Sequence, residues 1–128
     1  MAKLVNGGKT WVLDELLRAG NDLILGLYTN DTEPADAAVL GDLTQPSGNG
    51  YATKTLTGGS WSVSGNDASY AEQEFTASGG SWGAVYGYFI ADGATLLAVE
   101  SFKDGETPIN FTIGDGSALR VTPKLTAN

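Results

Sequence analysis

Hydrophobic and polar residues alternate along most of this chain, which is the spacing typical of β-strands with one buried face. The clearest example is a hairpin, in which residues 85–90 (VYGYFI) and 96–102 (LLAVESF) flank a predicted turn at 91–93. Residues 114–126 predict a closing strand, and shorter strands are predicted at 22–29, 51–57, 61–64, 69–77 and 109–113. The pattern predicts an all-β fold, an antiparallel β-sandwich or jelly roll of about eight strands.

The strand predicted at residues 22–29 is largely apolar on both faces. Leu23, Leu25 and Leu27 point one way, and Ile24, Gly26 and Tyr28 point the other. This pattern favours a central strand that is covered on both sides, or on one side by a helix.

One segment, residues 11–19, has helical spacing instead. Its apolar stripe consists of Val12, Leu13, Leu16 and Leu17. Thr10 is suited to cap the first turn, and Gly20 supplies the left-handed residue that ends the helix. A helix this short is unstable alone, so its stripe must pack on the β domain or on another subunit. The sequence thus predicts a single domain over residues 1–128 that includes an N-terminal helical element, residues 1–20.

Residues 30–50 form the least regular stretch, because Pro34 and Pro46 interrupt a run rich in Asp, Gly and Ser. Residues 37–44 are expected to add a short edge strand. Long loops in compact domains are often functional or are ordered by a partner. This loop is therefore our candidate for an arm that reaches a neighbouring subunit.

Composition narrows the possible functions. Only 17% of residues are charged and 18 are glycine, which suits short strands, tight turns and surfaces buried against neighbours. The net charge is −8 with no cluster of Lys or Arg, so we expect no nucleic-acid partner. The chain has no cysteine or histidine. We find no signal peptide and no run of transmembrane length, so we expect no membrane partner and synthesis in the cytoplasm without secretion.

Three motifs suggest chemistry that their context does not support. Residues 79–83 (GGSWG) match a nucleophile elbow, but such a site needs a histidine base, which this chain lacks. Residues 8–10 (GKT) resemble the end of a phosphate-binding loop without its earlier glycine. Glu72 and Glu74 lie on one strand face, roughly 7 Å apart, as a pair for glycoside hydrolysis would. We expect solvated glutamates there and no enzymatic activity.

Acidic and aromatic residues offer two further alternatives. Asp31, Glu33 and Asp36, and separately Asp104 and Glu106, are acidic clusters that match no calcium-loop spacing, so we predict no metal and no cofactor. Trp61 and Trp82 follow glycine-rich turns at strand starts, and the sequence leaves them evenly divided between core and interface.

Five segments carry a family resemblance: GYF at 87–89, LLAVESF at 96–102, GDGSALRVTP at 114–123, LILGLYTN at 23–30 and GYATKTL at 50–56. They resemble small virion structural proteins of tailed bacteriophages, closely over the last third and more loosely before it. The resemblance implies a jelly-roll-like sandwich that serves as capsid cement or decoration, or as a small tail or fibre component. None of the motifs is catalytic.

We expect a cement protein, because the chain is one small domain without coiled-coil heptads or shaft repeats. It would be made in the cytoplasm of the host bacterium, bind the outer surface of the assembled head, and bridge subunits of the major capsid protein as a homotrimer. The alternative is a small tail, fibre or baseplate module that contacts host glycan through exposed aromatic side chains. The predicted interface residues are Trp11, Leu13, Leu16, Leu17, Pro34, Val39, Leu40, Trp61 and Trp82.

Overall fold

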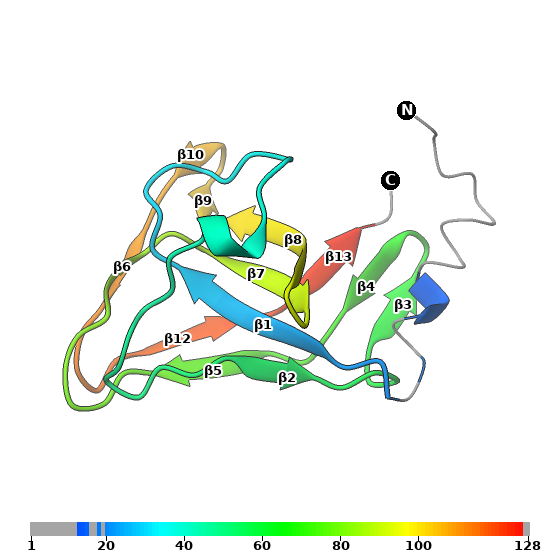
Figure 1. Cartoon of the computed structure of the whole chain (residues 1–128), viewed down its shortest axis with the longest axis horizontal. Helices are drawn as coiled ribbons and strands as arrows, with labels where there is room; N and C mark the ends of the chain where they lie inside the picture. Colours follow the sequence, from blue (N-terminus) through cyan, green and yellow to red (C-terminus); the bar gives the residue numbers. More distant parts are fainter. Residues whose placement is uncertain (1–12, 16–17, 19, 127–128) are drawn as a thin grey trace.

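The computed structural model describes residues 13–15, 18 and 20–126, which form a mostly β structure with antiparallel pairing throughout (Figure 1). The main sheet has the strand order β2-β1-β7-β8, formed by β1 (Leu23–Tyr28), β2 (Lys54–Leu56), β7 (Gly87–Asp92) and β8 (Thr95–Ser101). The predicted hairpin is confirmed as β7 and β8. β1 is central, as its two apolar faces predict.

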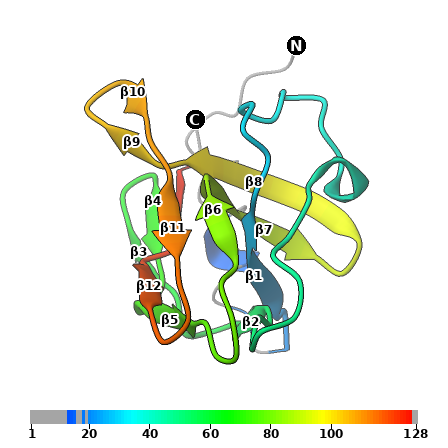
Figure 2. The same ribbon diagram turned by 90° about the vertical axis from the view of Figure 1, so that its left-hand side faces the viewer.

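The other strands form four small sheets. β3 (Ser62–Ser64), β4 (Asp67–Ser69) and β13 (Lys124–Thr126) make one of them. The remaining three are pairs: β5 (Gln73–Thr76) with β12 (Ala118–Val121), β6 (Gly83–Val85) with β11 (Phe111–Ile113), and β9 (Lys103–Asp104) with β10 (Thr107–Pro108). Figure 2 shows most of these short strands on one side of β1 and β7, with the β9–β10 hairpin beyond the end of β8. The antiparallel β class is thus observed, whereas the sheets are too fragmented to establish a jelly roll.

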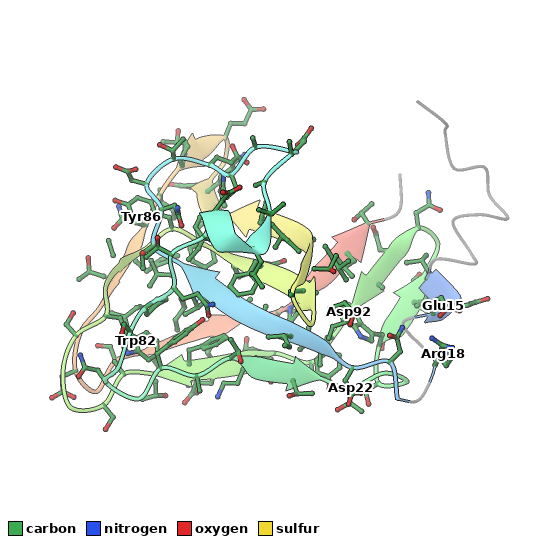
Figure 3. The ribbon with its side chains drawn as sticks, in the orientation of Figure 1. Glu15, Arg18, Asp22, Trp82, Tyr86 and Asp92 are labelled. Atoms are coloured by element: carbon green, nitrogen blue, oxygen red, sulfur yellow. The ribbon has the colours of Figure 1, made fainter. Side chains whose placement is uncertain are left out.

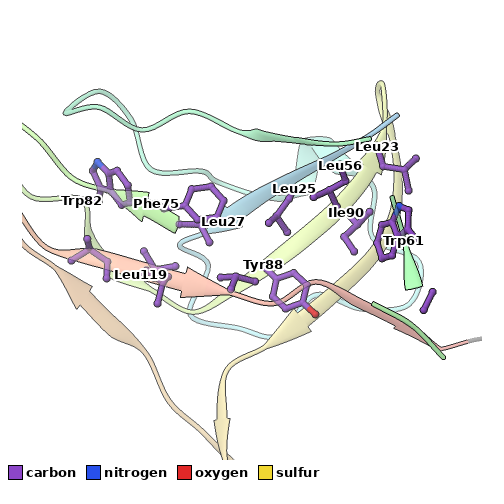
Figure 4. Packing of buried hydrophobic residues seen from close by; sticks show 14 of the residues in the cluster. Leu23, Leu25, Leu27, Leu56, Trp61, Phe75, Trp82, Tyr88, Ile90 and Leu119 are labelled. Carbon is purple, nitrogen blue, oxygen red and sulfur yellow. The ribbon is translucent and has the colours of Figure 1, made fainter. Parts of the chain in front are cut away.

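The principal core lies between the inner face of the main sheet and the small sheets (Figure 4). Leu25 and Leu27 on β1 project into it, where they join Phe75 of β5 and Leu119 of β12. Trp61 and Trp82 lie at opposite ends of this row of side chains. Alternation along β1 sends Gly26 and Tyr28 to the other face of the sheet.

Two glycines on the outer face admit aromatic rings from the neighbouring strand. Gly26 pairs with Phe89, and Gly87 pairs with Tyr28. A Cβ atom added at Gly26 would overlap the Phe89 ring, and one at Gly87 would overlap the Tyr28 ring. These reciprocal pairs bring β1 and β7 together without a gap.

One predicted strand is divided in the structure and another is shortened. Residues 114–126 separate into β12 and β13, and the strand predicted at 69–77 is observed as β5, with Ser69 as the last residue of β4. Because β4 pairs with β13 and β5 with β12, the break between β12 and β13 lies opposite the gap between β4 and β5. Pro123 lies at the break between β12 and β13 and has no N–H to donate, while its carbonyl oxygen accepts from the Tyr70 amide at 3.0 Å.

The edge strand predicted at residues 37–44 is wrong. The chain makes a 3₁₀ turn there, η1 (Leu40–Asp42). The Asp42 carboxylate accepts a hydrogen bond from the Val39 amide at 3.0 Å, and the Leu43 amide donates to the Leu40 carbonyl oxygen at 3.1 Å. These local bonds compete with strand pairing. The sequence also gave no indication of the β9–β10 hairpin.

A short helix lies at the N-terminal side, where residues 13–15 are helical. Leu13 is buried in the principal core, so this part of the helix packs on the β domain of its own chain. Gly20 has φ +87°, which confirms the predicted left-handed stop. The Asn21 side chain donates to the Glu15 carbonyl oxygen at 2.8 Å, and Gly58 leaves room for the Arg18 and Asn21 backbone.

Candidate docking surface

The long loop folds back over the outer face of the main sheet. Leu43 packs with Tyr28, Phe89 and Ala91 in a second, smaller cluster. The loop is therefore the cover that the second apolar face of β1 requires. Because Tyr28 and Phe89 are almost fully buried, this cover is part of the folded domain.

Hydrogen bonds close the loop at its base. The Thr29 amide donates to the Thr44 carbonyl oxygen at 2.7 Å. The Asn30 side chain makes two more: its Oδ1 accepts from the Thr44 amide at 2.8 Å, and its Nδ2 donates to the Asp42 carbonyl oxygen at 3.0 Å. The surface that residues 31–41 offer is therefore held in place by the sheet.

Large exposed apolar side chains occur at three positions of the described chain, and all lie on or beside this part of the molecule. Val39 is 61% exposed in the loop, Leu97 is 50% exposed on β8, and Phe111 is 42% exposed on β11. Phe111 packs edge-to-face on Phe102, with ring centroids 5.3 Å apart. Exposed apolar residues that cluster indicate an interaction surface, whereas scattered ones do not.

Leu97 owes its exposure to a β-bulge. Ile90 pairs with Ala98 and Ala91 pairs with Leu96, so Leu97 has no partner on β7. The extra residue bends β8 and turns the Leu97 side chain outward. β8 is also an edge of the main sheet, since β7 is its sole neighbour among the strands described.

Two open hollows adjoin β8. The first lies between Ala35 and Ala38 of the loop and residues 96–99 of β8. The second runs from Val99 along the end of β8 to Phe111, with Glu33 at its border. Val99 lines both hollows.

Charge is unevenly distributed between this surface and the rest of the molecule. The loop carries Asp31, Glu33, Asp36 and Asp42, and residues 19–53 contain no lysine or arginine. Among the residues that the structure describes, one ion pair is found at the loop, Lys103 with Glu33 at 3.8 Å. Elsewhere in the described chain, ion pairs join Arg18 with Glu15, Arg120 with the glutamate pair Glu72 and Glu74, and Lys124 with Asp67. Figure 3 shows Glu15 and Arg18 together at the end of the molecule opposite Tyr86.

Two tyrosines fix β8 to the sheet. The Tyr28 and Ser101 hydroxyl groups are hydrogen-bonded at 2.8 Å, and the Tyr88 hydroxyl donates to the Glu100 carboxylate at 2.5 Å. Burial raises the pKa of Tyr28. Burial also raises the pKa of Tyr88 far above its usual value, and the adjacent Glu100 carboxylate adds to that shift. Both hydroxyl groups therefore stay protonated and hold the strand.

The structure divides the predicted interface residues into three groups. Val39 is exposed, and Pro34 and Leu40 are half-buried. Leu13, Trp61 and Trp82 lie in the core, at 2%, 4% and 8% exposure. Trp11, Leu16 and Leu17 are outside the described residues.

Because Trp61 and Trp82 are buried, they belong to the core and not to an interface. Trp82 Nε1 donates to the Asn49 carbonyl oxygen at 3.0 Å, and its ring packs edge-to-face on Tyr51. Trp61 packs in the same way on Tyr70, with ring centroids 5.4 Å apart. Sequence reasoning did not single out the exposed residues Leu97 and Phe111. For Leu97 the reason is that its bulge depends on the pairing of β8 with β7.

The candidate catalytic groups are occupied by structural contacts. The Ser81 hydroxyl donates to the Ile113 carbonyl oxygen at 2.9 Å, in a strand-to-strand connection instead of a strand-to-helix turn. Arg120 bridges the glutamate pair, with its Nε 3.0 Å from Glu74 and 3.8 Å from Glu72. The GKT motif at residues 8–10 lies outside the described residues.

Within residues 13–15, 18 and 20–126, no three Asp or Glu side chains converge as a metal site requires. Over the same residues, no helix is long and apolar enough to cross a membrane. Comparison with known proteins found no matching family model, no matching curated protein and no matching solved structure.

Proposed function

We propose that this protein is a capsid cement protein of a tailed bacteriophage, with a jelly-roll-like fold. It binds the outer surface of the assembled head and bridges neighbouring subunits of the major capsid protein without catalysing a reaction. Support comes from the motifs that resemble phage virion proteins. Four of the five coincide with or overlap β1, β2, β7 and β8, the strands of the main sheet, and the fifth contains β12.

The observation that carries the proposal is the apolar surface beside β8. Val39, Leu97 and Phe111 are large apolar side chains held in water by an ordered loop and two strands. Covering such a surface on a partner removes apolar area from water and stabilises the complex. The exposed apolar area is small, so one copy of the protein binds weakly.

Repetition over a symmetric shell makes weak contacts effective. A homotrimer presents three copies of the surface, and engagement of the first raises the effective concentration of the others. A protein that binds the assembled shell and not its separated subunits shifts the equilibrium toward the shell by mass action. The net charge of −8 keeps the free protein soluble before it binds.

The test is the heat resistance of phage heads with and without this protein. Heads that lack it should release their DNA at a lower temperature, and addition of the purified protein should restore the resistance. A matched control adds the Leu97→Lys variant at the same concentration. Heads of equal heat resistance with and without the bound protein contradict the cement function.

The tail-module alternative loses its main support. It relies on Trp61 and Trp82 stacking on host glycan, and both side chains are buried in the core. Trp82 is further held by its hydrogen bond to Asn49. We therefore adopt the cement function alone.

A further inference from the structure

The groove between β8 and the loop has an apolar floor and an acidic border. We call it the β8 groove and define its floor as Ala35, Ala38, Leu96, Leu97 and Val99. Its border carries Asp36 beside the first hollow and Glu33 and Glu100 beside the second. We infer that the β8 groove docks a partner protein segment whose apolar side chains are flanked by lysine or arginine.

The apolar part of the argument rests on β8. β8 (TLLAVES) is an edge strand with neither lysine nor proline, so its bulge is what interrupts pairing with a further strand. Its bulge places Leu97 outward at 50% exposure, next to the hollow under Ala35 and Ala38. An apolar side chain from a partner would cover Leu97 and fill that hollow.

The charge of the border identifies the partner. Of the described residues, Lys103 is the one basic residue that lines the two hollows, and its pairing with Glu33 at 3.8 Å is solvent-exposed and therefore weak. Asp36 has no lysine or arginine within ion-pair distance among the described residues, whereas the Glu100 carboxylate already accepts a hydrogen bond from Tyr88. A basic segment would neutralise Asp36 and Glu33 as it docks.

The same charge argues against other occupants. A second copy docked through the same groove would place acidic borders against each other. Nucleic acid and anionic lipid are repelled for the same reason. Complementary charge therefore favours a basic protein segment. This inference rests on the proposed function in one respect, namely that the segment belongs to a subunit of the phage shell.

The test uses the full-length protein and two synthetic ten-residue peptides. One peptide alternates lysine and valine, and the other alternates glutamate and valine. Amide spectra of the ¹⁵N-labelled protein are recorded during titration with each. The lysine peptide should shift amide signals of residues 33–39 and 95–101, and the glutamate peptide should shift none of them. Shifts concentrated on other strands, or absent, overturn the inference.

Two variants with the same added charge separate the groove from general electrostatics. Leu97→Lys introduces lysine in the groove, and Thr55→Lys introduces it on β2, an exposed position at the opposite edge of the same sheet. Leu97→Lys should weaken binding of the lysine peptide about tenfold, and Thr55→Lys by less than about twofold. Equal affinity of the two variants contradicts the groove.

A second pair of variants serves if Leu97→Lys does not fold. Glu33→Gln with Asp36→Asn should weaken peptide binding at low salt, whereas Glu72→Gln with Glu74→Gln should leave it unchanged. Equal effects from both double variants overturn the inference.

The results also separate this inference from the cement function. A peptide-binding protein that binds no shell refutes the cement function alone, and shells that bind Leu97→Lys as well as the original protein refute the groove alone.

Discussion

Replacing Gly87 by alanine tests the packing of β1, β7 and β8 directly. A methyl group there would overlap the Tyr28 ring and the Glu100 carbonyl oxygen. The carbonyl belongs to the backbone of β8, which pairs with β7 along its length, so it cannot move aside as a flexible side chain would. Overpacking of this kind costs about 2–3 kcal/mol, and the lower chain entropy of alanine in the unfolded state offsets about 0.5 kcal/mol of it. We expect a net loss of about 2 kcal/mol, or about 8 °C in Tm for a domain of this size.

Gly41→Ala is the matched control. Gly41 lies in η1 with open space where its Cβ would project and without a positive φ. This substitution should leave stability unchanged or raise it by up to about 1 kcal/mol. Urea unfolding followed by tryptophan fluorescence measures both variants. If Gly87→Ala unfolds at the same urea concentration as the original protein, the description of the sheet is wrong.

Two further predictions concern buried aromatic residues. Trp82→Phe should lower the free energy of unfolding by about 1–3 kcal/mol more than Trp61→Phe does. The reason is that Trp82 Nε1 donates a hydrogen bond to Asn49, whereas Trp61 Nε1 is buried with no partner among the described residues. Urea midpoints that fall equally in the two variants would contradict this. The raised pKa of Tyr88 stabilises the fold below the unfolded tyrosine value of 10.0, and this contribution is lost as the pH rises above it. Thermal unfolding should therefore show a steeper fall in Tm above pH 10 for the original protein than for Tyr88→Phe, and parallel curves would refute the assignment.

Local patterns in the sequence predicted the main sheet well. The alternation in 85–102 fixed β7 and β8, and the two apolar faces of β1 correctly indicated a strand covered on both sides. Gly20 was recognised as the end of the helix, since left-handed backbone favours glycine. These features depend on residues close together in the chain.

Features set by distant partners were missed or left open. The burial of Trp82 depends on the Asn49 carbonyl oxygen, 33 residues away in the chain. The exposure of Leu97 depends on a bulge against β7. The break at Pro123 could have been predicted, because proline lacks the donor that a continuous strand needs. The turn at Asp42 was harder to see, since residues 37–44 also have apolar residues at strand spacing.

The position of this protein on the phage particle tests the cement function most directly. Electron microscopy of heads with and without it should reveal additional density repeated over the whole outer shell, with the β8 groove turned toward the capsid subunits. Density confined to a single vertex or to the tail would contradict the account.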